Sequence, residues 1–217
     1  MGFKERLTKE WLFWDGGTGS VLQSWGLQAG ELPETWNINH PEKIVELNKG
    51  YLEAGCDIIN TNTFGANRLK YPDNLEEIVT KAVEHAKKAR ELTGRTDALI
   101  ALDLGPTGKL LEPLGDLSFD DAVDIYAEVI EYGTKAGADV ILIETMQDSY
   151  ELKAAVLAAK EHSHLPVCAT VVFDEKGKML TGGTPESVVA LLEGLHIDAL
   201  GINCSLGPTQ IKPFVER

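Results

Sequence analysis

Short, almost wholly apolar runs alternate with longer amphipathic stretches along this chain. The apolar runs are rich in Val and Ile, and they cover residues 11–17, 57–64, 98–106, 139–146, 166–173 and 198–205. Side chains of a strand alternate between its two faces, so runs that are apolar on both faces predict parallel strands buried on both sides.

The amphipathic stretches between these runs predict helices. They read PEKIVELNKGYLEAG, NLEEIVTKAVEHAKKARELTG, SFDDAVDIYAEVIEYGTKAG, SYELKAAVLAAKEH and PESVVALLEG. Several begin with Ser or Pro, which favour a first helical turn, and several close on Gly, which favours the turn after a helix. Strand–helix units in succession predict a parallel α/β fold.

Three of the strand beginnings share one pattern. EAGCDIINTNT and KAGADVILIET align without gaps, and LHIDALGINCS follows the same frame from its aspartate. In a (β/α)₈ barrel, alternate strands contribute side chains to one interior layer, and the active site lies at the C-terminal strand ends. The repeat predicts this barrel, with one polar side chain at the same distance after each opening aspartate: Asn62, Glu144 and Asn203 after Asp57, Asp139 and Asp198.

A capping role in turns is the alternative explanation for these polar residues. It could account for Asn62 or Asn203, because Asn is common where a chain leaves a strand. It accounts poorly for Glu144, because Glu is a weak turn former and this one lies inside an apolar run.

Six strand–helix units are visible, whereas a closed barrel has eight. The chain ends within a further amphipathic stretch, IKPFVER. Either the fold is an open six-stranded sheet, or residues 1–217 are one barrel domain truncated at its C-terminus. The second alternative is favoured, because natural chains rarely end partway through an amphipathic helix.

Composition restricts the partners and the compartment. The formal net charge of −14 argues against nucleic acid and anionic membranes as partners. No run approaches the ~18 apolar residues that cross a bilayer, and the N-terminus lacks the apolar core of a signal peptide. The three cysteines, Cys56, Cys168 and Cys204, are far apart and odd in number, so a disulfide framework is not expected. A cytoplasmic protein is expected.

Two strand ends carry an aspartate followed by glycines. DGGTGS places Asp15 and Gly16 after the first strand, and LDLGPTG places Asp103 at the end of the third. Glycines let backbone N–H groups approach a ligand carboxylate or phosphate. DGGTGS matches neither common nucleotide-binding motif, and a tight turn with a capping aspartate explains it equally well.

The stretch GINCSLGP places Cys204 directly after Asn203 at the end of the sixth strand. A thiol at that place in a barrel could act as a nucleophile or as a metal ligand. No histidine is positioned to act as its base. One thiolate does not make a zinc site, so any further ligands would lie elsewhere.

With these motifs, the chain resembles the homocysteine S-methyltransferase family. The matching stretches are DGGTGS, LNKGYLEAGCDIINTNTFGANRLK, LDLGPTGKLLEPLG, LIETMQDSYELKAAVLAAK, FDEKGKMLTGGTP and GINCSLGP, which follow the family order over nearly the whole chain. The similarity is greatest to members that form the N-terminal homocysteine-binding module of cobalamin-dependent methionine synthase.

The resemblance implies a zinc-dependent (β/α)₈ barrel that transfers a methyl group to the thiol of homocysteine and gives methionine. Cys204 matches one of three zinc ligands, and the other two belong to a GGCCG motif that this chain lacks. Gly65 stands where the betaine-using branch has a tyrosine, which argues against that branch. The family's homocysteine contacts carry over to Asp15, Gly16 and Glu144, of which Asp15 and Glu144 are the catalytic candidates, and further lining candidates by position are Thr63, Asp103, Asn203 and Ser205.

Partners follow from the same resemblance. The methyl donor could be methylcobalamin, a methylfolate or an S-methylated amino acid, and cobalamin, folate or reductase modules could belong to a longer protein. With one zinc ligand of three, the chain by itself is expected to be inactive and to self-associate. The alternatives are a catalytically silent interaction domain and another barrel enzyme such as an aldolase. The aldolase is disfavoured because no lysine lies at a strand end to form a Schiff base.

Overall fold

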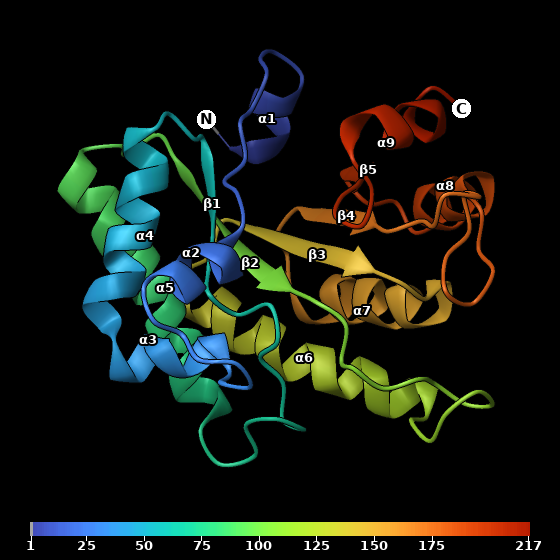
Figure 1. The fold of residues 1–217 in the computed structure, drawn as a ribbon, viewed down its shortest axis with the longest axis horizontal. Helices are drawn as coiled ribbons and strands as arrows, with labels where there is room; N and C mark the ends of the chain where they lie inside the picture. The colour runs from blue at the N-terminus through green and yellow to red at the C-terminus, as the bar shows by residue number, and fades with distance from the viewer. Residues whose placement is uncertain (1) are drawn as a thin grey trace.

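The computed structural model describes residues 2–217 and confirms the parallel α/β architecture. The second to sixth predicted strands form one sheet, in which each strand pairs in parallel with the next along the chain. This order is that of successive strands in a (β/α)₈ barrel (Figure 1). The strands are β1 (Ile58–Asn60), β2 (Leu99–Leu104), β3 (Val140–Met146), β4 (Val167–Val171) and β5 (Ala199–Ile202).

The first predicted strand, residues 11–17, is reduced to a single parallel bridge between Trp14 and Ile58. It pairs on one side only, and its side chains Trp11 and Phe13 are 91% and 67% exposed. Within residues 2–217 the sheet is therefore open, with Trp14 at one edge and β5 at the other.

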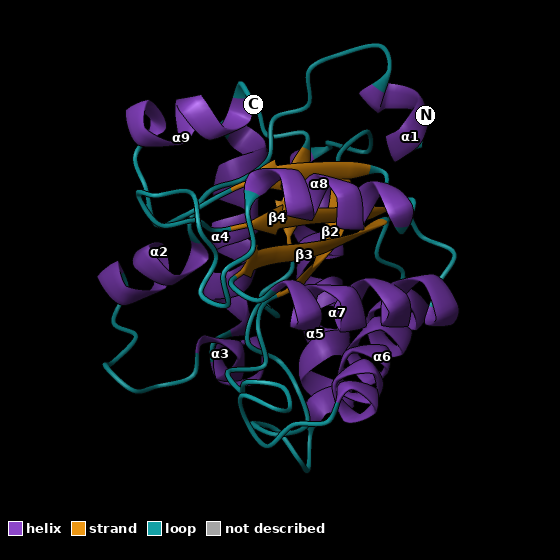
Figure 2. Ribbon diagram, turned by 90° about the vertical axis from the view of Figure 1, so that its right-hand side faces the viewer, coloured by secondary structure: helices purple, strands orange, loops and turns teal. Residues whose placement is uncertain are grey.

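All five predicted helices form and cover the outer face of the sheet (Figures 1 and 2). They are α4 (Pro41–Glu53), α5 (Leu75–Thr93), α6 (Phe119–Ala136), α7 (Ser149–His162) and α8 (Pro185–Gly194). Shorter helices connect or flank them: α1 (Phe3–Leu7), α2 (Thr18–Ser24), the 3₁₀ helix η1 (Pro33–Thr35), α3 (Trp36–Asn39) and α9 (Pro208–Val215). No helix among residues 2–217 has both the length and the apolar character needed to cross a membrane.

The two faces of the sheet are buried in different surroundings. Outward side chains such as Leu102, Ile141 and Val171 pack with the helices in the main core. Inward side chains near the strand beginnings form a smaller apolar cluster that includes Leu99, Val140 and Leu142. The inward positions that follow near the strand ends are polar, so the polarity of the barrel interior changes along each strand: Asp103, Glu144 and Asn203.

The repeated aspartates have a structural role at the opposite end of the sheet. Each carboxylate accepts a hydrogen bond from a backbone N–H of the preceding strand, at 2.8–2.9 Å. Each aspartate therefore joins the beginnings of two neighbouring strands, and the pairs are Asp57 with Phe13, Asp139 with Ile100, and Asp198 with Val167.

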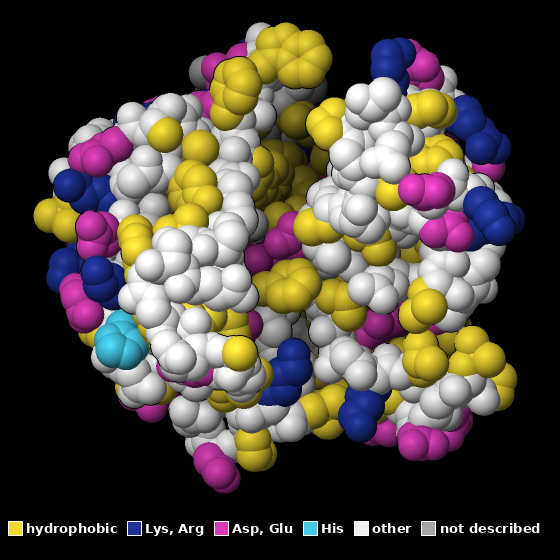
Figure 3. Space-filling model, viewed as in Figure 1, with side chains coloured by type: hydrophobic (Ala, Val, Ile, Leu, Met, Phe, Trp, Pro, Cys, Tyr) yellow, Lys and Arg dark blue, Asp and Glu magenta, His cyan; other side chains and the backbone are white. Residues whose placement is uncertain are grey.

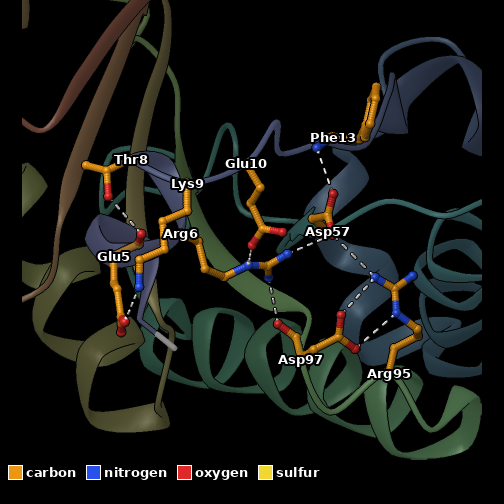
Figure 4. A network of polar contacts seen from close by, with 9 residues as sticks. All are labelled: Glu5, Arg6, Thr8, Lys9, Glu10, Phe13, Asp57, Arg95 and Asp97. Carbon is orange, nitrogen blue, oxygen red and sulfur yellow. Dashed lines mark hydrogen bonds and ion pairs between the residues drawn. The ribbon is translucent and has the colours of Figure 1, made fainter.

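Helix α1 lies across the N-terminal end of the strands and is held there by Arg6 (Figure 4). The buried Arg6 guanidinium donates to Asp57 Oδ1 at 2.8 Å, to the Asp97 carbonyl at 2.9 Å and to Glu10. Phe3 of the same helix joins the apolar cluster inside the sheet. Helix α1 thereby covers the apolar end of the interior and leaves the polar end open.

Candidate active site

A cavity of about 850 Å³ lies on the inner face of the open sheet and extends to the C-terminal ends of the strands. Figure 3 shows it as a hollow with apolar walls and acidic groups at its centre. None of the residues 2–217 that line it is Lys, Arg or His. The acidic side chains that line it are Glu10, Asp15, Glu34, Asp103 and Glu144.

Asp15 reaches the cavity from the loop after Trp14. Its Oδ2 accepts a hydrogen bond from the Asn60 N–H at 2.7 Å, whereas its buried Oδ1 has no partner among residues 2–217. Burial, and then the negative charge of Glu144, raise the pKa of Asp15 to about 7.

Asp103 and Glu144 form a hydrogen-bonded carboxyl pair. Asp103 is 5% exposed, and its Oδ1 also has no partner among residues 2–217. Burial first, and the neighbouring Glu144 second, raise the pKa of Asp103 well above its usual range. Burial also raises the pKa of Glu144, and the hydrogen bond with Asp103 opposes that shift.

Asn203 connects Glu144 to the segment that carries the thiol. Its Nδ2 donates to Glu144 Oε2 at 2.7 Å and to Thr145 Oγ1 at 2.9 Å. Its Oδ1 accepts from the Thr145 N–H at 3.2 Å and from Thr170 Oγ1 at 3.0 Å. These bonds fix the Asn203 side chain between β3, β4 and β5.

The backbone around the thiol adopts an uncommon conformation. Thr145, Cys204 and Ser205 have φ angles of 61°, 55° and 51°, in the left-handed region that residues other than glycine seldom occupy. This turn leaves Cys204 exposed at the cavity mouth, with its Sγ 3.7 Å from Thr145 Oγ1.

The residues present do not by themselves fit a zinc ion. Cys204 is the one thiol at the mouth, because Cys168 lies buried at the apolar end and the Cys56 Sγ donates to the Trp14 carbonyl. Within residues 2–217, no three His, Cys, Asp or Glu side chains are grouped so as to hold a metal. A zinc site takes three or four protein ligands, so Cys204 alone does not hold the metal.

The glycines of the first loop expose backbone donors. No group among residues 2–217 accepts the N–H of Gly16 or Gly17. A Cβ atom at Gly16 would lie 3.1 Å from the Tyr51 hydroxyl, so a larger residue would crowd this wall. Both glycines line the cavity, where their N–H groups are suited to an anionic group.

Other candidates are engaged elsewhere. Thr63 is fully buried and donates to the Asp103 carbonyl at 2.7 Å, and Ser205 donates to the Phe173 carbonyl at 2.9 Å. Asn62 borders the cavity, but its amide donates to the Pro33 carbonyl and to Asn37 Oδ1, so it does not join Glu144 and Asn203.

Three residues that support the site were not predicted from the sequence. Asn60 holds Asp15, while Thr145 and Thr170 hold Asn203. Alternation along the strands could have identified Thr170, because it is the one polar residue in PVCATVVF. The contact of Asn60 with Asp15 uses a backbone N–H, which no side-chain pattern reveals.

Sequence comparisons with known proteins point to one family. A family model described as homocysteine S-methyltransferase matches residues 12–217. Methionine synthase of Mycobacterium tuberculosis is 30% identical over 221 residues, which cover 94% of this chain and 18% of that protein. Methionine synthase of Mycobacterium leprae is 31% identical, over 98% of this chain and 19% of that protein. The chain thus spans less than a fifth of the length of these curated relatives.

Solved structures agree with the sequence comparisons. The apo form of the homocysteine methyltransferase MmuM from Escherichia coli aligns with a TM-score of 0.75 and 25% identity, over 92% of this chain and 74% of that one. Its metallated form aligns with a TM-score of 0.79 and 24% identity, over 91% and 76%.

Proposed function

The chain belongs to the homocysteine S-methyltransferase family, and from this premise we propose that its cavity binds homocysteine as the acceptor of a methyl group. The product would be methionine. The observation that carries the proposal is the group of carboxyls, Asp15, Asp103 and Glu144, which lies beside Asn203 and Cys204 with no basic side chain of residues 2–217 on the cavity wall.

The amino group of homocysteine would bind to the carboxyls. Buried carboxylates are costly unless a cation neutralises them, and an ammonium group brings both a charge and three N–H donors. Glu144 and Asp15 each have a donor that stabilises the charged form, so we propose that these two carboxylates are among the acceptors of the ammonium.

The carboxylate of homocysteine would bind to the first loop. Gly16 and Gly17 offer backbone N–H groups to which no other group among residues 2–217 binds. Binding both ends of the amino acid would orient its side chain, which is how an enzyme lowers the entropic cost of a reaction between two molecules.

The thiol of homocysteine would then point toward Cys204. Asn203 hydrogen-bonds Glu144 and precedes Cys204, so the group that binds the amine and the turn that carries the thiol are held together. Cys204 is the one zinc ligand that we propose from residues 2–217. Thr63 and Ser205 would act by holding the loops of the mouth.

The test of this function is methyl transfer by the complete protein that contains this chain. Methylcobalamin, a methylfolate and an S-methylated amino acid should be tried in parallel as donors to homocysteine. Cys204→Ser should abolish methionine formation and lower the bound zinc. Cys56→Ser is the matched control, because its hydroxyl can still donate to the Trp14 carbonyl. Unchanged methionine formation by Cys204→Ser would contradict the proposal.

A further inference from the structure

The three carboxyls that meet in the cavity do not have equal hydrogen-bond donors. Asp15 accepts from a backbone N–H of Asn60, and Glu144 accepts from the Asn203 amide. Asp103 accepts from neither kind of donor, and its buried Oδ1 has no partner among residues 2–217. Of the three groups, Asp103 is therefore the one whose ionised form has the least support.

The contact between Asp103 and Glu144 requires a proton. Two ionised carboxylates have only acceptors and repel one another, whereas a protonated carboxyl donates to a carboxylate. Glu144 already accepts a hydrogen bond from the Asn203 N–H, which favours its ionised form. The shared proton is therefore assigned to Asp103.

The surroundings of Asp103 contain no compensating charge. The charged groups that act on it are Glu144 of β3, Asp15 of the first loop and Glu34 of η1, and all of them are acidic. The hydroxyl of Thr61, directly after strand β1, accepts the Asp103 backbone N–H at 3.2 Å. Burial and this negative field act together in raising the pKa of Asp103.

We infer that Asp103 holds a proton, which it donates to Glu144, and that this proton leaves the cluster when the ammonium group of an amino acid binds. The inference rests on the proposed function for the identity of the ligand. No covalent bond to carbon changes in this step: the O–H bond of Asp103 breaks, the proton passes to solvent, and the new carboxylate faces the cation.

The number of N–H donors on the ammonium group supports this exchange of a proton for the ligand. An ammonium group has three N–H donors, and the cluster offers three carboxyl groups. In the free protein the proton limits the repulsion among them, and in the complex the ammonium replaces it. Before the ligand arrives, Asp103 keeps Glu144 in place through the shared proton, and in the complex its carboxylate is a further acceptor of the ammonium.

Infrared spectroscopy of the ligand-free chain tests the first half of the inference. A protonated carboxyl has a C=O stretch distinct from that of carboxylates, and it should be present in D₂O at about pH 8, where a group with the pKa of about 7 assigned to Asp15 is mostly ionised. Asp103→Asn should remove this band, and Asp116→Asn, an exposed control, should retain it. A wild-type spectrum without the band, or a band that persists in Asp103→Asn, would overturn the inference.

Titration calorimetry with L-methionine tests the release. Methionine has the same amino-acid end as homocysteine but no thiol proton, so any proton released comes from the protein. In buffers of different ionisation enthalpy at about pH 8, the wild-type enthalpy should vary as expected for release of about one proton per ligand. Asp103→Asn, which still donates to Glu144, should bind with little buffer dependence.

The outcomes separate the two proposals. Wild-type binding with no buffer dependence overturns the proton release and leaves the proposed function standing. Failure of both methionine and homocysteine to bind overturns the proposed function, and the release with it.

Discussion

The carboxamide of Asn203 has both N–H donors and both oxygen lone pairs occupied, and every partner belongs to the cavity mouth: Glu144, Thr145 and Thr170. These four hydrogen bonds fix the orientation of the amide. It also directs the Thr145 hydroxyl, which accepts from Asn203 and is left with its own proton to donate toward the Cys204 Sγ at 3.7 Å. At the scale of single residues, the site is thus held by a few directional bonds between strand ends.

Glu144→Gln should weaken binding of homocysteine by ~1.5–3 kcal/mol, the usual range for a hydrogen bond to a charged group. The amide keeps the shape of the side chain but removes the charge that an ammonium requires. Titration calorimetry measures the change. Glu112→Gln, in an exposed loop, is the control that should bind as the wild type does, and equal affinity of both variants would exclude Glu144 from the ammonium site.

Asp103→Asn should make the fold more stable at neutral pH. The folded pKa of Asp103 lies above its unfolded value, so below about pH 4 both states are protonated and no penalty exists. As pH rises through that value the unfolded state ionises freely and the folded state does not, so the wild type loses stability. The gain in melting temperature of the variant should therefore grow between about pH 4 and pH 7. A gain that is the same at both pH values would show that ionisation is not its cause.

At the scale of elements, the 3.6-residue pattern of apolar positions predicts the helices that are long enough to bury one face over several turns. All five long helices lie where the 3.6-residue pattern placed them, and Ser118 caps α6 through the Asp121 N–H. Helices α1, α2 and α3 have four to seven residues, too few for such a pattern. The strands were predicted too long: β1 ends at Asn60, and soon after it Asn62 turns away to hydrogen-bond Pro33 of η1 and Asn37 of α3.

A pair of glycine substitutions tests how closely helix and sheet approach. Gly133 of α6 lies against β2, and a Cβ atom there would come within 2.4 Å of the fully buried Leu102 side chain. Gly133→Ala should therefore destabilise the fold by ~1–3 kcal/mol. Gly50→Ala, at an open position of α4, should instead stabilise it by ~0.5–1 kcal/mol. Urea denaturation measures both, and a stabilising Gly133→Ala would contradict the close approach.

For the whole molecule, the sequence predicted the architecture and the position of the site along the strands. It did not predict the hydrogen bonds within the site. The phase of Glu144 and Asn203 predicted that they would meet, and their side chains are 2.7 Å apart. Asn62 has the same phase but turns to Asn37, a residue of α3 that no pattern had placed nearby. The roles assigned to individual site residues stay predictions.

The open sheet should lead the 217-residue chain to self-associate. Strand β5 has an unpaired edge within residues 2–217, with Leu200 44% exposed, and Trp11 lies almost fully exposed near the other edge. Unpaired edges and exposed apolar side chains recruit other chains. Sedimentation should detect dimers or larger species, and Trp11→Arg should reduce them. A monomer at all concentrations would contradict this expectation.

A crystal structure of the chain with L-homocysteine bound tests the central claim most directly. The account predicts the amino nitrogen within about 2.7–3.0 Å of carboxyl oxygens of Glu144 and Asp15. It also predicts the carboxylate at the Gly16 and Gly17 N–H groups and the sulfur toward Cys204. Homocysteine bound in the reverse orientation, with its sulfur among the carboxyls, or bound outside this cavity, would contradict the account.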